Sequence, residues 1–374
     1  MSHKIINAAK TAVDAFIFDH FTRPHTIPRA SVIFSRFFWE DPFWQNIGSG
    51  RMQKEAYECL NALGYVTSFA GQEDRWYPKR IWNADLIVAL APAFLKLPKK
   101  IPGTTFLYTC NTHVTIKNRR LAEAAKTWNL PQDAPADPLI FLPAYEKADY
   151  LLIAENDEGI SNFTSLGISK DRICRYNNAI DSDIWIQNPQ KRDKFTFVCW
   201  SSELGLRKGL PVLVNSWKKW YNCQDAELLI VGMPTRSTDL LFGGQREGLV
   251  SPGLRIHLAT FPTWHKPLIE LIGSSHVAVY PTLEDAQPSC LLEMTSCGLP
   301  VITTRESGVD FDLEFCYYIT TNDVDSLAEG FEYWFQKRDN TKRAGNLARD
   351  YILKHHTWDV FRKRFSAIMC EIMK

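Results

Sequence analysis

The chain has 374 residues, of which 45% are hydrophobic and 23% are charged, and its formal net charge is +1. This length is too great for one ordinary core and fits two domains of common size, and the composition is that of a folded protein. A net charge so close to zero creates no general field toward nucleic acid, so we expect no nucleic-acid partner. Any anion site must therefore be a local cluster of donors.

The 9 cysteines are scattered, and no two of them have the Cys-x-x-Cys spacing. This pattern argues against a disulfide framework and a structural zinc site, and it predicts a reducing, cytoplasmic location. No run reaches the roughly 18 apolar residues of a membrane span. An apolar stripe at helical spacing over residues 5–17 is expected to pack on the first domain, and peripheral contact with a membrane surface is the alternative.

Short apolar runs rich in β-branched and aromatic residues alternate with longer amphipathic stretches. This order predicts an α/β protein with parallel sheets and crossover helices. In the first half, strands are expected at residues 30–34, 66–69, 86–90, 105–108 and 150–154. In the second half, they are expected at residues 196–200, 227–231, 254–258, 277–280 and 301–303. The two sets predict two separate sheets.

A shift in composition separates the two sets of strands, because residues 187–194 are polar and suit a linker. We therefore assign residues 1–186 to a first domain and residues 187–356 to a second. The terminal segment, 357–374, is predicted to form a helix with one apolar stripe. Such a stripe needs a surface to pack on, and no further sequence follows it.

The most informative stretch follows the predicted strand at 277–280. A loop carries Glu284 and Asp285, and a helix is then expected to begin near Pro288 and to stop at Gly298. Proline at a helix start and glycine at its end are the usual residues. This order places the start of the helix beyond the strand ends, where open α/β sheets bind ligands.

The first turn of this helix contains Ser289 and Cys290, and Glu293 lies one turn in. A diphosphate at the helix start would meet unpaired N–H donors and the positive end of the helix dipole. Carboxylates accept hydrogen bonds from vicinal hydroxyls, so the acids of the loop and helix suit a ribose and a hexose. The alternative is a capped surface helix with a solvated acid.

A pair of adjacent cations, Arg207 and Lys208, precedes Gly209 after the predicted strand at 196–200. In a nearly neutral protein, two cations and a glycine at a helix entry predict a phosphate site. Taken alone, the same three residues are also compatible with a solvated turn.

Together these segments resemble the donor-binding signature of retaining glycosyltransferases of family 4. That signature is a glutamate, seven residues and a second glutamate, running into a Cys-Gly-Leu-Pro-Val-Ile strand entry. Glu293 matches the second glutamate, which in the family contacts the ribose, and Asp285 stands at the first. Lys208 matches the diphosphate-binding lysine of a Lys-Gly pair. The family's nearby arginine is assigned to Arg207, because its usual place holds Trp200 and two serines.

In the first half, Gly48 and Gly50 resemble the glycine-rich loop of the same family, although a plain tight turn explains them equally well. His113 follows the strand at 105–108, where family members often carry a histidine that faces the donor sugar. The alternative interpretation is a structural histidine. The segment from Asn178 to Asp181 resembles the family's hinge turn. It is architectural, and we assign it no chemistry.

The resemblance implies a GT-B fold: two Rossmann-like parallel-sheet domains facing across a cleft, with the terminal helix crossing back to the first. It implies transfer of a sugar from a nucleotide diphosphate-sugar to a glycan, a lipid-linked saccharide or a small molecule, with retention of anomeric configuration. The candidate catalytic residues are His113, Lys208 and Asp285, and we expect no metal and no cofactor besides the sugar nucleotide. The alternatives are an epimerase or phosphorylase of this architecture, and a non-catalytic sugar-nucleotide-binding subunit.

Overall fold

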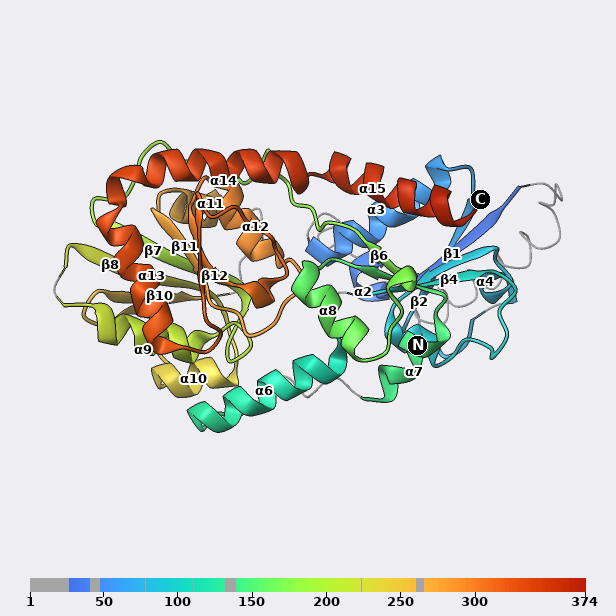
Figure 1. Ribbon diagram of the computed structural model, residues 1–374, viewed down its shortest axis with the longest axis horizontal. Helices are drawn as coiled ribbons and strands as arrows, with labels where there is room; N and C mark the ends of the chain where they lie inside the picture. The colour runs from blue at the N-terminus through green and yellow to red at the C-terminus, as the bar shows by residue number, and fades with distance from the viewer. Residues whose placement is uncertain are drawn as a thin grey trace, which may run out of the picture.

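The computed structural model describes residues 27–40, 48–77, 79–109, 111–131, 139–222, 224–259 and 266–374. They form two α/β domains that lie side by side along the longest axis of the molecule (Figure 1). The predicted apolar stripe over residues 5–17 lies outside the described part of the chain. Within that part, no helix combines the length and the apolar character needed to cross a bilayer.

The first domain is built on a sheet of six parallel strands in the order β2-β1-β3-β4-β5-β6. Its strands are β1 (Arg29–Phe34), β2 (Val66–Gly71), β3 (Leu86–Ala89), β4 (Thr104–Tyr108), β5 (Tyr150–Ile153) and β6 (Ile173–Arg175). Its helices are α2 (Arg36–Glu40), α3 (Gly48–Ala62), α4 (Lys79–Trp82), α5 (Ala91–Phe94), α6 (Val114–Trp128), α7 (Leu142–Lys147) and α8 (Asp157–Ser165), with the 3-10 turns η2 (Leu139–Phe141) and η3 (Lys170–Arg172).

The second domain is built on seven strands in the order β13-β12-β11-β7-β8-β10-β9. They are β7 (Phe195–Leu204), β8 (Ala226–Pro234), β9 (Glu247–Ser251), β10 (Leu254–Leu258), β11 (Val277–Tyr280), β12 (Val301–Thr304) and β13 (Cys316–Ile319). The helices are α9 (Leu210–Trp220), α10 (Arg236–Phe242), α11 (Lys266–Gly273), α12 (Ser289–Ser296), α13 (Val324–Gln336) and α14 (Thr341–His355), with the turns η4 (Arg305–Ser307) and η5 (Arg338–Asn340).

All ten predicted strands are present, and the predicted two-sheet fold is confirmed. Three strands were not predicted: β6, β9 and β13. β6 has three half-buried residues, and β9 contains Gly248 and lies at a sheet edge with largely exposed side chains, so neither carries a continuous apolar signal. β9 pairs antiparallel with β10 at one edge of an otherwise parallel sheet.

The apolar stripe of the terminal helix finds its partner in the first domain. After α14, helix α15 (Trp358–Ile372) crosses back and lies over α3 (Figure 1). Phe361 and Phe365 are buried in one cluster with Met52 and Ala56 of α3. The predicted crossing of this helix is therefore confirmed, and the chain passes between the domains twice.

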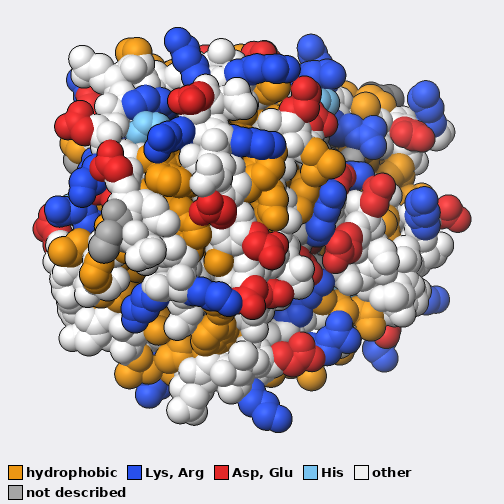
Figure 2. Space-filling view, turned by 60° about the vertical axis from the view of Figure 1, so that its left-hand side comes forward, with side chains coloured by type: hydrophobic (Ala, Val, Ile, Leu, Met, Phe, Trp, Pro, Cys, Tyr) orange, Lys and Arg blue, Asp and Glu red, His pale blue; other side chains and the backbone are white. Residues whose placement is uncertain are grey.

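The face of the second domain seen in Figure 2 carries basic and acidic side chains that are interspersed rather than gathered by sign. This distribution agrees with the formal net charge of +1. A strong anion site must then come from cations brought together locally by the fold.

We expect Phe361→Ala to destabilise the first domain by about 3–5 kcal/mol, because it removes a fully buried ring between α15 and α3. Urea unfolding followed by circular dichroism measures the change. Leu353→Ala on α14 is the control, since Leu353 is 42% exposed and should lose less than about 1 kcal/mol. Equal losses in the two variants would contradict the docking of α15.

Candidate active site

The carboxyl ends of strands from both sheets meet at the boundary between the domains. Asn156, just after β5, donates from Nδ2 to the carbonyl of Arg305, which directly follows β12, at 2.8 Å. Glu155 lies beside it, and its Oε2 would be 2.5 Å from a Cβ added to Gly308 of the second domain. A side chain at position 308 would displace this carboxylate, and the φ of 74° there also favours glycine. The segments that follow these strands in the two sheets therefore face one shared space. Open α/β sheets bind their ligands at this edge.

Two helix starts converge on this space. Helix α3 begins at Gly48 and α12 begins at Ser289, and a Cβ added to Gly48 would lie 3.8 Å from Ser289 Oγ. Gly50 and Cys290 follow in the first turns and are buried. Pro288 is the N-cap residue of α12, and its side chain accepts no hydrogen bond from the helix N–H groups. The starts of the two helices therefore lie close together, and the positive ends of both helix dipoles favour an anion there.

Two connections of the second domain are joined into one wall of the site: the β7–α9 turn (residues 205–209) and the β11–α12 loop (residues 281–288). Thr282 Oγ1 and the Leu283 N–H both donate to the carbonyl of Arg207, at 3.1 and 2.9 Å. Gly209 has a φ of 70°, and a Cβ there would lie 1.9 Å from the carbonyl oxygen of Pro281. The turn can approach the loop this closely only because residue 209 is glycine.

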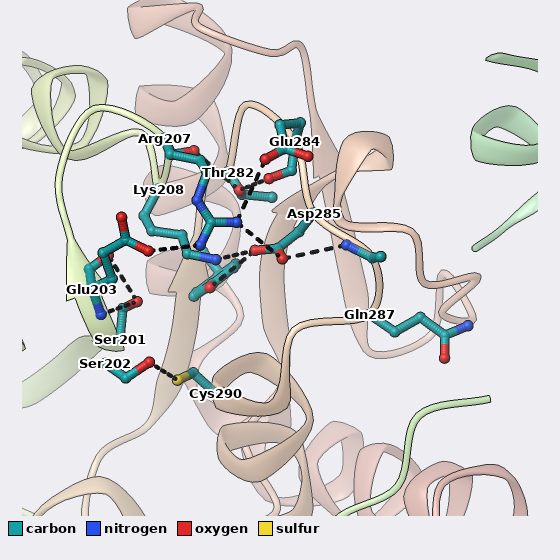
Figure 3. A network of polar contacts seen from close by, with 12 residues as sticks. Ser201, Ser202, Glu203, Arg207, Lys208, Thr282, Glu284, Asp285, Gln287 and Cys290 are labelled. Carbon is teal, nitrogen blue, oxygen red and sulfur yellow. Dashed lines mark hydrogen bonds and ion pairs between the residues drawn. The ribbon is translucent and has the colours of Figure 1, made fainter. Parts of the chain in front are cut away.

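The predicted cations lie on this wall, facing the predicted acids (Figure 3). Arg207 reaches Glu203 Oε2 at 3.0 Å, Asp285 Oδ1 at 3.4 Å and Glu284 Oε1 at 3.5 Å. Lys208 Nζ contacts Asp285 Oδ2, which also accepts from the hydroxyl of the buried Tyr280 at 3.3 Å. The sequence-predicted Arg207, Lys208 and Asp285 thus form one network, and Glu284 joins it.

Burial and charge set different ionisation in the two neighbouring acids. Burial raises the pKa of Asp285, but Lys208 and Arg207 more than offset this, so its pKa lies below the usual range and the group is ionised. Burial raises the pKa of Glu284 above its usual value, and Arg207 offsets only part of the effect. Asp285 is therefore the acid that the two cations hold in its charged form.

Glu293 lies on α12 and points into the second domain. It is 4% exposed, and its Oε2 accepts from the indole Nε1 of Trp200 at 2.9 Å. Burial raises its pKa from 4.5 to about 7, against the opposing effect of this hydrogen bond. Trp200 stands where the resembled family has a glycine and a nearby arginine. Its contact with Glu293 was not predicted. The two residues are 93 positions apart, so no local pattern in the sequence indicated the contact.

His113 is a helix cap in the first domain. Its Nδ1 accepts from the Thr115 N–H at 3.3 Å at the start of α6, and its ring packs against Tyr145 and Phe163. Burial lowers its pKa to about 4, so the imidazole is neutral near pH 7. Among the described residues, no hydrogen bond joins it to the Arg207 network. This geometry corresponds to the structural interpretation of the histidine.

Two cavities are lined in part by Thr112 of the first domain. A small one of about 10 Å³ is lined by Glu155 and Asp285 from opposite domains. Burial, and then the charges of Glu284 and Asp285, raise the pKa of Glu155 well above its usual value. The other has a volume of about 240 Å³ and is lined by Leu90, Pro92, Tyr108, Asn111, Phe141 and Tyr145. Neither cavity was predicted from the sequence.

Residues 194–336, less than half of the chain, match the sequence profile of the family described as Glycosyl transferases group 1. No curated protein sequence is significantly similar to the chain. Among solved structures, the sucrose-phosphate synthase of Thermosynechococcus elongatus is 12% identical, with a TM-score of 0.69 over 92% of this chain and 99% of that one. WaaG, a glycosyltransferase of lipopolysaccharide biosynthesis, is 16% identical, with a TM-score of 0.60 over 91% and 99%.

The chain has the GT-B fold. A further neighbour is the Anabaena protein HepE in complex with UDP and glucose, at 10% identity and a TM-score of 0.60 over 92% of this chain and 99% of that one. The sequence match and the fold together support a glycosyltransferase. Membership of family 4 and retention of configuration remain predictions. Within the described ranges, no group of three or more His, Cys, Asp or Glu side chains is arranged to hold a metal ion.

The raised pKa of Glu293 predicts a pH-dependent stability. Between 4.5 and about 7, the folded protein keeps a proton that the unfolded chain has released, so stability falls as pH rises through this window. Glu293→Gln should remove the fall, and the variant should gain about 2–4 kcal/mol relative to the parent between pH 4.5 and 8. Urea unfolding at several pH values measures this gain. The exposed Glu329→Gln is the control, and parallel curves for parent and Glu293→Gln would contradict the expectation.

Proposed function

We propose that the protein transfers a sugar from a nucleotide diphosphate-sugar to an acceptor hydroxyl, with retention of anomeric configuration. The observation that carries this proposal is the convergence of two helix starts and two cations on one space between the domains. Such a site matches a diphosphate, because its donors are fixed and its charge is local. The sequence match of the second domain supports the same reaction class.

In this proposal, the diphosphate lies against Arg207, Lys208 and the first amides of α12. When the glycosidic bond to the diphosphate breaks, negative charge develops on the leaving oxygen. Cations and amides that are already in place stabilise that charge more in the transition state than in the ground state. Lys208 would shift part of its pairing from Asp285 to phosphate, so that Asp285 can accept hydrogen bonds from the sugar hydroxyls.

We assign the acceptor to the cavity of about 240 Å³ in the first domain. Its walls combine apolar and aromatic side chains with a few polar ones, which is the usual make-up of a small-molecule site. Phe141 and Tyr145 offer ring faces, and Asn111 and Thr112 offer hydrogen bonds on the side toward the donor. A sugar ring of a glycan or of a lipid-linked saccharide would suit this combination.

The proposal includes no metal ion and no cofactor besides the sugar nucleotide, because cations and helix dipoles supply the positive charge. A cytoplasmic location is proposed on the cysteines: those in the described part of the chain are free thiols, as expected in a reducing compartment. One competing function has a specific observation in its favour. Asp285 is occupied by Lys208 and Tyr280, as it would be in a subunit that binds the sugar nucleotide without turning it over.

The first test is donor binding. UDP-, GDP- and ADP-sugars are compared for thermal stabilisation, with UDP-glucose first because HepE has been crystallised with it. A matching donor at 100 times its Kd stabilises the fold by about 2.7 kcal/mol. Slow hydrolysis of that donor by the purified protein would support an enzyme, whereas binding without hydrolysis or transfer would favour the non-catalytic subunit. No stabilisation by any donor would contradict both.

Lys208→Met should lower kcat by about 100-fold or more, because it keeps the buried aliphatic stem and removes the charge that meets the diphosphate. Release of nucleoside diphosphate measures the rate. The control is Lys219→Met, in the last turn of α9, where the lysine pairs with Asp325 at an exposed position. Near-parental turnover in Lys208→Met would remove the phosphate role of Lys208.

A further inference from the structure

The segment that joins the domains also holds both ends of α12. At the amino end of this helix, Asn178 is bonded to the β11–α12 loop. At the carboxyl end, Ser296 Oγ donates to the carbonyl of Trp185 at 2.7 Å. Arg349 donates to the carbonyls of Trp185 and Ser296 at 2.9 and 2.6 Å, which closes the same junction. The segment from Asn178 to Trp185 is therefore fastened along the helix that carries Ser289 and Glu293.

The contacts of Asn178 with the loop are direct and buried. Its backbone N–H donates to Gln287 Oε1 at 2.8 Å, and its Nδ2 donates to the carbonyls of Ala286 and Gln287 at 2.9 and 2.8 Å. Gln287 is 2% exposed, and its own N–H donates to the Ser307 carbonyl at 2.9 Å. These hydrogen bonds enclose the two residues that follow Asp285.

Gln287 has a φ of 52°, in the left-handed region that glutamine rarely adopts. Such a conformation is unfavourable and persists only where surrounding contacts impose it. Here the contacts are those with Asn178 and Ser307. The reversed backbone at Gln287 separates Asp285 from the start of α12, so it sets the angle between the carboxylate and the helix amides.

Asn178 also touches the second crossing between the domains. Its carbonyl oxygen lies 2.8 Å from His356 Nδ1, which must carry the proton because a carbonyl only accepts. Ile180 N–H donates to the His356 carbonyl at 3.0 Å. Burial lowers the pKa of His356 to about 4, so it is neutral here. Asn178 therefore connects its own crossing between the domains with the second crossing, at His356, and with the β11–α12 loop.

We propose that Asn178 and Gln287 are positioning residues that tie the β11–α12 loop to the hinge, so that domain closure and the placement of Asp285 on the donor sugar change together. This inference rests on the proposed sugar transfer and adds a coupling to it. Neither side chain is required to touch the donor. Their effect is on the orientation of Asp285, and misplacement by about 1 Å at a reacting centre costs about 100-fold in rate.

Gln287→Asn is the diagnostic variant. Asparagine accepts the left-handed backbone, but its side chain is shorter by about 1.5 Å and cannot reach the Asn178 N–H. We expect kcat with the best donor to fall by about tenfold or more, while the Kd of the free nucleoside diphosphate stays within about threefold. Asn178→Asp is the second variant. It keeps the size of the side chain but loses the two hydrogen bonds that Nδ2 donates. We again expect kcat to fall while the Kd of the nucleoside diphosphate stays near the parental value.

Asn322→Gly is the matched control. Asn322 also has a positive φ, of 59°, and also bonds across the domains, because its Oδ1 accepts from Trp128 Nε1 at 2.6 Å. It lies between β13 and α13, outside the β11–α12 loop. We expect parental kcat in Asn322→Gly. An equal loss there would mean that any weakened domain contact slows turnover, and it would overturn the proposal.

Hydrogen exchange with the UDP-, GDP- or ADP-sugar that gives the largest thermal stabilisation supplies a readout that a merely structural role would not change. In the parent protein, this donor should slow exchange in peptides covering residues 176–181 and 284–290 together. In Gln287→Asn, it should protect the second peptide and leave the first unchanged. Parental kcat in both variants, or protection of both peptides in Gln287→Asn, would overturn the coupling while sugar transfer stands. Absence of any donor binding would overturn both.

Discussion

The charged contact of Arg207 and Lys208 with Glu284 and Asp285 is the interaction on which the site depends. All four carboxylate and cationic groups are largely withdrawn from water, and their desolvation costs several kcal/mol per ion before attraction repays it. A packed apolar contact would hold these two loops together at least as well. Stability therefore does not explain the arrangement, whereas the anionic ligand of our proposal would, because it would pair with Arg207 and Lys208 in place of the acids.

The second domain supplies the cations, but the first domain decides the shape of the space. The start of α3 at Gly48 faces the start of α12 at Ser289, so the two helix dipoles act together only while the domains remain close. α15 secures one crossing by burying Phe361 against the first domain, and Asn178 secures the other. The closeness of the two helix starts therefore depends on how the two domains are held together.

The sequence was informative where the signal was local. Buried strands such as β11 and β12 stand out as apolar runs, and Pro288 and Gly298 bracket α12 correctly to within one or two residues. The cluster of Arg207, Lys208 and Asp285 followed from resemblance to a known motif. The Trp200–Glu293 bond and the Asn178–Gln287 contacts could not be predicted, because they join residues 93 and 109 apart and depend on tertiary packing.

The aspartate at position 285 gives these long-range contacts their importance. A carboxylate that reaches about 1.5 Å less than glutamate stays close to the backbone that carries it. Its position is then set less by side-chain rotation and more by the backbone of the β11–α12 loop. That backbone is held in an unfavourable left-handed turn at Gln287 by Asn178. A shorter acid is therefore placed correctly only if its loop is held in one position. Asn178, in the segment that joins the domains, holds the loop there.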